Sequence, residues 1–193
     1  MNCSFRLTYK TGGVERLLYA PSLDGPLSLS VTDDGVRRTV TAKAAERVTL
    51  TSYSETGHDF FTVATPEDPD PKGDLYFING YQSWTETREF YGDARERDVM
   101  RLPGVLVRNF AFDRYGDATF YEYDKRILHG YDVFYVRGRS NGFVASLNGS
   151  RAYLIIEVVR RDGAVSLLSD VGGVTLAPGE EYVICDYIYA GTY

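Results

Sequence analysis

The sequence predicts an all-β fold in which antiparallel strands form a sandwich or a barrel. Apolar and polar residues alternate along many short segments of the 193 residues. Turn dipeptides such as Asn148-Gly149 and Asp162-Gly163 separate several of these segments, at a spacing of about ten residues. No helical periodicity longer than a few turns is evident, which excludes parallel α/β folds and a TIM barrel.

The first third of the sequence predicts five strands. Ser4 to Tyr9 places every second residue, all apolar, on one face, and Gly12-Gly13 then turns the chain. Asp33-Asp34-Gly35 is a strong hairpin signal between the third and fourth segments. The five expected strands are Ser4–Tyr9, Val14–Tyr19, Leu27–Thr32, Val36–Lys43 and Arg47–Tyr53.

The middle of the chain is less regular. Pro66 to Gly73 contains three prolines and three acidic residues, so we expect a surface loop there. Leu75 to Ile78 is a short apolar run and a candidate buried strand. Thr85 to Arg101 is rich in charge and poor in alternation, which favours a long loop, with a short helix as an alternative inside it.

The second half again predicts strands, and Pro178-Gly179 precedes the last of them. We find neither an internal repeat nor a low-complexity segment, and we expect residues 1–193 to form a single domain. The expected strands are Val105–Phe112, Thr119–Tyr123, Tyr131–Arg137, Gly142–Leu147, Tyr153–Val159, Ala164–Leu168 and Tyr182–Tyr189.

Charge and composition exclude several classes of partner. The net charge of -6 disfavours binding to nucleic acid or to an anionic membrane surface. The sequence has neither an apolar run long enough to span a bilayer nor an N-terminal secretory signal. Cys3 and Cys185 lie near opposite ends, and we expect two reduced, buried thiols, with a disulfide between them as the alternative. These features predict a cytoplasmic protein.

Sequence motifs for metal, cofactor or nucleophile chemistry are missing. The chain has no glycine-rich phosphate loop, no zinc-type cluster and no nucleophile elbow, so we expect no metal and no cofactor. His58 and His129 are the two histidines, and His129-Gly130 precedes a predicted strand. Four aspartates are expected to be turn and loop residues: Asp33, Asp34, Asp68 and Asp70.

The segment FINGYQSW, Phe77 to Trp84, is the most informative in the chain. Asn79-Gly80 is expected to turn the chain at the end of a strand. An aromatic ring beside amide and hydroxyl groups suits a sugar, which offers an apolar C–H face and polar hydroxyls. Tyr81, Gln82 and Trp84 are therefore candidate substrate-binding residues. The alternative is that Trp84 anchors the core of the sandwich.

This segment resembles the N-G-W-Q-S-W segment of glycoside hydrolase family 36, the bacterial α-galactosidases. Later segments are similar to clostridial-type members in order and approximate spacing, and the resemblance extends roughly from residue 75 to the C-terminus. The first seventy residues match only in general β character. The similar segments are Tyr115-Gly116-Asp117 with Phe120, His129-Gly130-Tyr131, Tyr135-Val136-Arg137 and Gly142–Ser146.

The resemblance implies an antiparallel β-supersandwich, the N-terminal domain of a retaining α-galactosidase whose catalytic barrel follows it. In such enzymes two barrel carboxylates, about 5–5.5 Å apart, perform hydrolysis, so this chain is expected to be non-catalytic. The second Trp of the motif, here Trp84, is expected to reach the substrate pocket of the barrel. Tyr81 replaces the first Trp, while Gln82 and Ser83 match. The resemblance also implies a homo-oligomer to whose contacts this domain contributes.

Two other functions are compatible with the sequence. One is a free-standing carbohydrate-binding module that uses its tyrosine-rich strands as a sugar platform. The other is a small enzyme such as a sugar mutarotase, with His129 as the acid and Glu157 as the base on one sheet. Within the α-galactosidase interpretation, the alternatives for the parent enzyme are an α-N-acetylgalactosaminidase and a galactosyl transfer enzyme.

Overall fold

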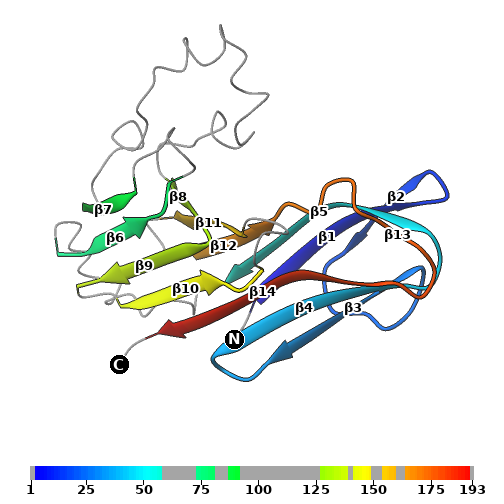
Figure 1. Cartoon of the computed structure of the whole chain (residues 1–193), viewed down its shortest axis with the longest axis horizontal. Coiled ribbons are helices and arrows are strands. Elements are labelled where there is room, and N and C mark those ends of the chain that lie inside the picture. The colour runs from blue at the N-terminus through cyan, green and yellow to red at the C-terminus, as the bar shows by residue number, and fades with distance from the viewer. Residues whose placement is uncertain are drawn as a thin grey trace, which may run out of the picture.

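In the part of the chain that the computed structural model describes, two antiparallel sheets of seven strands each form the fold (Figure 1). The structure describes residues 3–57, 73–80, 87–91, 127–138, 141–148, 154–159 and 164–191. Within these residues every regular element is a strand, and none is a helix able to cross a membrane. The expected all-β sandwich with two large packed sheets is confirmed.

Sheet A contains strands from both ends of the chain. In spatial order these are β2 (Val14–Leu18), β1 (Cys3–Thr11), β5 (Val48–Gly57), β12 (Ala164–Ser169), β11 (Leu154–Val159) and β8 (Ile127–Tyr131), with the short β13 (Thr175–Leu176) paired to β5. Because β5 lies between β1 and β12, the first and last thirds of the chain share one hydrogen-bonded ladder.

Sheet B is assembled in the same way. Its spatial order is β3 (Leu27–Asp33), β4 (Arg37–Ala44), β14 (Glu181–Gly191), β10 (Gly142–Ser146), β9 (Val133–Arg137), β6 (Leu75–Ile78) and β7 (Arg88–Tyr91). The last strand, β14, joins the β3–β4 hairpin to the strands of the middle of the chain.

The core lies between the sheets, as the alternation predicts. Along β1 the inward residues Phe5, Leu7 and Tyr9 are buried. Each fully buried large apolar side chain stabilises the fold by about 1.5–3 kcal/mol relative to an exposed position. The Cys185 thiol is buried here and is free, so the alternative of a disulfide to Cys3 is wrong. The largest fully buried side chains are Tyr187, Phe134, Leu7, Leu27, Leu29, Leu50, Leu154, Ile156 and Leu167.

Two expectations for the middle of the chain are wrong. Arg88 to Tyr91 was expected to be loop but is strand β7, an edge strand in which Phe90 alone is buried, so its charged residues obscure the alternation. Leu75 to Ile78 forms strand β6 as expected, but Leu75, Tyr76 and Phe77 are half-buried rather than buried.

The expected strand Tyr131–Arg137 is in fact the junction of two strands in different sheets. Tyr131 ends β8 of sheet A, Asp132 turns the chain, and β9 of sheet B begins at Val133. His129 therefore lies inside β8 rather than before a strand. Of the expected loop Pro66–Gly73, only Gly73 is among the described residues. Val105–Phe112, Thr119–Tyr123 and His58 also lie outside them.

Candidate functional site

The three candidate sugar-binding residues, Tyr81, Gln82 and Trp84, lie outside the described residues. The base of the segment that contains them is described, because β6 ends at Ile78 and β7 begins at Arg88. Ile78 and Arg88 are direct partners in the antiparallel ladder, so residues 79–87 form the connection of a β-hairpin. Its two ends are consequently held side by side at one end of sheet B (Figure 1).

Asn79 connects this base to the end of β8 in sheet A, and Thr87 connects the two ends of the hairpin to each other. The Asn79 carbonyl accepts a hydrogen bond from the Tyr131 N–H at 3.0 Å, and its Nδ2 donates to the Tyr131 carbonyl at 2.7 Å. Across the hairpin, Gly80 N–H donates to Thr87 Oγ1 at 3.0 Å, and Thr87 Oγ1 lies 3.5 Å from Asn79 Oδ1. The bonds of Asn79 and Gly80 thus fix where the candidate segment leaves the fold, while the residues that would complete the expected turn lie outside the described part of the chain.

Asp132, beside this base, connects the two sheets. Its φ of 59° is uncommon for a residue other than glycine. Its backbone N–H donates to Leu154 O at 2.7 Å, its carbonyl accepts from Ser146 N–H at 2.6 Å, and its Oδ1 accepts from Leu154 N–H at 2.9 Å. Partial burial raises the pKa of this carboxyl above its usual value. These hydrogen bonds hold the junction of the two sheets at Asp132, the residue that follows Tyr131, the partner of Asn79.

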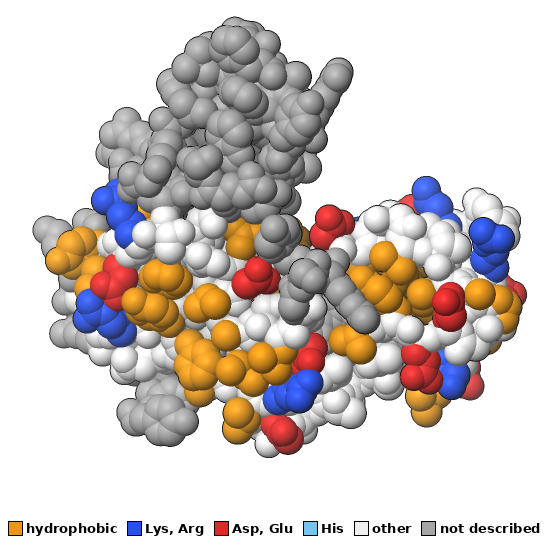
Figure 2. Space-filling view, in the orientation of Figure 1, with side chains coloured by type: hydrophobic (Ala, Val, Ile, Leu, Met, Phe, Trp, Pro, Cys, Tyr) orange, Lys and Arg blue, Asp and Glu red, His pale blue; other side chains and the backbone are white. Residues whose placement is uncertain are grey.

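An apolar band crosses the outer face of sheet B next to the hairpin base. Figure 2 shows hydrophobic side chains gathered over the part of the surface where β6, β9 and β10 lie. The rings of Phe77 and Tyr135 stack with centroids 4.7 Å apart and planes 3° apart. Each ring therefore covers one face of the other, which leaves less flat surface for a sugar than an isolated aromatic residue offers.

A charged pair borders this band. Arg137 donates to both carboxylate oxygens of Glu89, at 2.5 Å and 2.8 Å, and Tyr135 OH donates to Glu89 Oε1 at 2.9 Å. The hydrogen bond from Arg137 lowers the pKa of Glu89 to about 2, together with the hydrogen bond from Tyr135 and the positive charge of Arg137. The Glu89 carboxylate therefore stays ionised down to strongly acidic pH.

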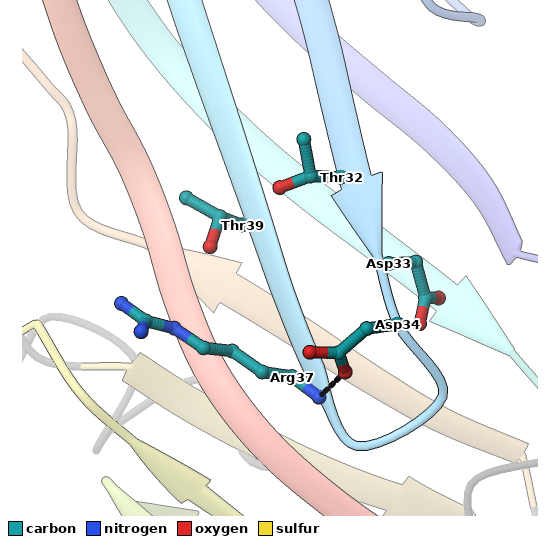
Figure 3. A pocket seen from close by; sticks show the side chains of 5 residues that line it. All are labelled: Thr32, Asp33, Asp34, Arg37 and Thr39. Atoms are coloured by element: carbon teal, nitrogen blue, oxygen red, sulfur yellow. Dashed lines mark hydrogen bonds between the residues drawn. The ribbon is translucent and has the colours of Figure 1, made fainter.

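An open pocket of about 290 Å³ lies at the β3–β4 turn, lined by Thr32, Asp33, Asp34, Arg37 and Thr39 (Figure 3). Asp34 Oδ1 accepts the N–H groups of Val36 and Arg37 at 2.9 Å and 2.7 Å. Arg37 extends toward β14, where its Nε donates to Asp186 Oδ1 at 2.8 Å and its Nη2 donates to Asp186 Oδ2 at 2.6 Å. Asp33 and Asp34 are thus turn residues, as the sequence predicts.

Behind this pocket, a charged cluster lies in the core. We call Arg38, Glu55 and Asp33 the inter-sheet cluster, because Arg38 of sheet B donates to Glu55 of sheet A at 2.5 Å and to Asp33 at 2.8 Å. The Glu55 side chain is 0% exposed and the Arg38 side chain 6%. Tyr53 OH donates to Glu55 at 3.2 Å, and the guanidinium lies 5.1 Å from the Phe5 ring centroid.

A β-bulge turns Glu55 inward. Tyr9 pairs with Leu50 but Thr8 pairs with Ser52, so Thr51 is an extra residue in β5. Leu50 and Tyr53 are both buried although an even spacing would put them on opposite faces. The alternation of β5 is shifted by one residue after the bulge, and Glu55 points into the core.

The register of sheet A brings His129 and Glu157 together. They are direct Cα partners on β8 and β11, and Glu157 is in turn the partner of Ser166 on β12. Ser166 Oγ lies 2.9 Å from Thr56 Oγ1 on β5. Glu157, Ser166 and Thr56 therefore form a row of polar residues across β11, β12 and β5, on the face of sheet A that is turned away from the core.

Comparison with known proteins does not assign the chain: no protein-family model matches it, and no curated protein matches it. Among the described residues, His, Cys, Asp and Glu form no group of three or more that suits a metal ion.

The sequence pattern did not predict the inter-sheet cluster. One signal was present, because Arg38 is in phase with the inward residues Val40 and Ala42. Glu55 gave none, since the bulge is not visible in the sequence.

Proposed function

We propose that the chain is the non-catalytic N-terminal domain of a retaining α-galactosidase, with Trp84 contributing to the substrate pocket of the parent enzyme. The observation that supports this most is the fixed base of the β6–β7 hairpin. Asn79, Gly80 and Thr87 hold both ends of the segment 81–86 at one end of a rigid two-sheet scaffold. Binding residues commonly lie on such connections between strands.

In this proposal each residue of the segment has a separate role. Trp84 provides an apolar face for the C–H side of a galactose ring, and Tyr81 provides a second aromatic surface. The Gln82 amide binds a sugar hydroxyl as donor and acceptor. The catalytic carboxylates belong to the parent's barrel domain, which is also the main partner of this chain. The parent enzyme is a cytoplasmic homo-oligomer that needs no cofactor.

The isolated chain is expected to leave a chromogenic α-galactoside intact. General acid and nucleophile must flank the glycosidic bond within about 5–5.5 Å in a retaining enzyme, and here they lie in another domain. Release of the chromophore is followed by absorbance, with the parent enzyme as the positive control. Robust hydrolysis by the isolated chain, retained after repurification, would show that the domain is itself catalytic.

Replacing Trp84 with alanine in the parent enzyme is expected to reduce kcat/KM for a galactoside by about 2- to 13-fold, since loss of one aromatic contact costs about 0.5–1.5 kcal/mol. Tyr19→Ala is the matched control. It removes an aromatic side chain that is 68% exposed and that directly follows β2, a strand of the other sheet from β6. Equal kcat/KM values for the two variants would exclude Trp84 from the pocket.

The register of sheet A favours a second candidate, sugar mutarotation by Glu157 and His129. Glu157 would take the proton of the anomeric hydroxyl while His129 protonates the ring oxygen, so the ring C–O bond breaks and the aldehyde forms. Polarimetry of fresh α-galactose decides the matter. This candidate predicts faster anomerisation with the chain than with the Glu157→Gln variant, whereas equal rates exclude it.

A further inference from the structure

The inter-sheet cluster has an unequal number of charges. Arg38 contributes one positive charge, and Asp33 and Glu55 contribute two negative charges when both are ionised, so the ionised cluster has a net charge of one negative unit. Its members are largely shielded from water, with side-chain exposures of 6% for Arg38, 20% for Asp33 and 0% for Glu55. A low-dielectric core favours a neutral cluster, which requires one bound proton.

The hydrogen bonds decide which carboxylate receives this proton. Asp33 reaches the surface pocket and accepts bonds from Tyr189 OH at 2.7 Å and Gly35 N–H at 2.9 Å, besides the bond from Arg38. These donors require an ionised carboxylate or a free lone pair. Glu55 has no exposed surface and lies between Arg38 and Tyr53. The cost of ionisation is therefore greater at Glu55.

We propose that the inter-sheet cluster is a proton-binding site, in which Glu55 takes up the proton and thereby makes the contact between the two sheets dependent on pH. This inference does not depend on the galactosidase proposal. It rests on one guanidinium shared by two carboxylates in the core.

The neighbouring groups agree with this assignment. Burial raises the pKa of Glu55 despite the opposing effect of Arg38. At Asp33 burial acts in the same direction, but hydrogen bonds from Tyr189, Gly35 and Arg38 bring the pKa below its usual value. Tyr53 of β5 and Cys185 of β14 also face the cluster, and burial raises the pKa of both, so they remain neutral. Tyr187 of β14 and Phe5 of β1 complete the surroundings.

The direction of the pH dependence follows from the raised pKa of Glu55. Between the ordinary glutamate pKa and this raised value, the folded domain holds a proton that the unfolded chain has lost. Above the raised pKa, the ionised Glu55 lowers the free energy of unfolding. This loss of stability disappears as the pH falls toward the ordinary glutamate pKa. Asp33 contributes in the opposite sense, because its pKa is lowered, and its stabilisation is lost only at still lower pH.

Titration of side-chain carboxyl carbons by NMR tests the proposal on the unmodified chain. Glu55 is expected to titrate above the ordinary glutamate value. Glu89, which also pairs with one arginine but on the surface, is the internal control and is expected to titrate near 2. A Glu55 midpoint at or below the ordinary value would overturn the proposal.

The Asp33→Asn variant tests whether the pKa of Glu55 is raised by the second carboxylate of the cluster or by burial alone. It removes one negative charge, so Arg38 and an ionised Glu55 form a neutral pair, and the Glu55 midpoint is expected to fall toward the ordinary value. Asp34→Asn is the control, because Asp34 bonds only the turn N–H groups and its pKa is lowered by them. If Asp33→Asn folds and leaves the Glu55 midpoint unchanged, the shared proton site is wrong. The wild-type titration decides the proposal if that variant does not fold.

Discussion

At a pH above the raised pKa of Glu55, replacing Arg38 with methionine is expected to lower the free energy of unfolding by about 3–5 kcal/mol, the cost of leaving a buried carboxylate without its cation. Glu55 is fully buried, and Arg38 is its cationic hydrogen-bond donor from the facing sheet. The Tyr53 hydroxyl that remains bonded to Glu55 is neutral and replaces little of the lost charge. Urea unfolding followed by circular dichroism measures the change, with the slope m checked for constancy.

Two variants show that the loss arises from the unpaired charge. Arg38→Met combined with Glu55→Met is expected to recover most of the stability, because an apolar pair of similar volume removes the need for compensation. Arg137→Met breaks the exposed pair with Glu89 and is expected to have a much smaller effect. If the double variant is as unstable as Arg38→Met, the cost is one of packing and the electrostatic explanation fails.

Gly138→Ala is expected to lower the free energy of unfolding by about 2–4 kcal/mol, through backbone strain and a steric clash together. Gly138 follows β9 with a φ of 139°, a conformation that residues with side chains rarely adopt. A Cβ atom there would lie 2.2 Å from the Gly73 carbonyl oxygen and 2.7 Å from Asp74 Oδ1. Gly73 and Asp74 would have to move away from Gly138. They directly precede β6, which is paired with β9 from Leu75 onward, so this movement would disturb the start of the β6–β9 ladder.

Gly12→Ala is the matched control for this prediction. Gly12 also has a positive φ, of 54°, but a Cβ atom there would meet no atom within 4 Å. It therefore reports the conformational cost alone, about 1–2 kcal/mol for a left-handed residue. Thermal unfolding of both variants gives the comparison. Equal losses for Gly12→Ala and Gly138→Ala would mean that the close approach of Gly73 has no energetic consequence.

The sequence predicted most of the fold because period-two alternation is a direct consequence of half-buried strands. Phe5, Leu7 and Tyr9 lie on one buried face as expected, and Asp33-Asp34-Gly35 forms the expected hairpin turn. Prediction failed where tertiary contacts, rather than local pattern, define a strand. β7 is a four-residue edge strand that begins with two charged residues, and the chain passes from β8 in sheet A to β9 in sheet B at a single residue, Asp132.

The candidate site was only partly predictable. Asn79-Gly80 signalled a turn, and the structure adds the bonds from Asn79 to Tyr131 that no local pattern reveals, since the two residues are 52 apart. The pairing of His129 with Glu157 depends on strand register, which a single sequence does not specify. The inter-sheet cluster depends on the bulge at Thr51, which reverses the face on which Glu55 lies.

The free-standing carbohydrate-binding module remains the main alternative to the galactosidase proposal. Such a module predicts heat on calorimetric titration of the isolated chain with galactosides, with Tyr81 and Trp84 as its aromatic platform. The stacked arrangement of Phe77 and Tyr135 counts against a second platform on the outer face of sheet B. The accessory-domain proposal places sugar binding in the parent's pocket, where the barrel supplies most of the contacts.

Reading the coding sequence downstream of Tyr193 tests the assignment to an α-galactosidase most directly. The proposal predicts an open frame of about 250 residues or more, in which strands alternate with helices and acidic residues lie at strand ends, as in a catalytic (β/α)8 barrel. A stop codon directly after Tyr193 would contradict it, because Trp84 would then have no barrel pocket to enter.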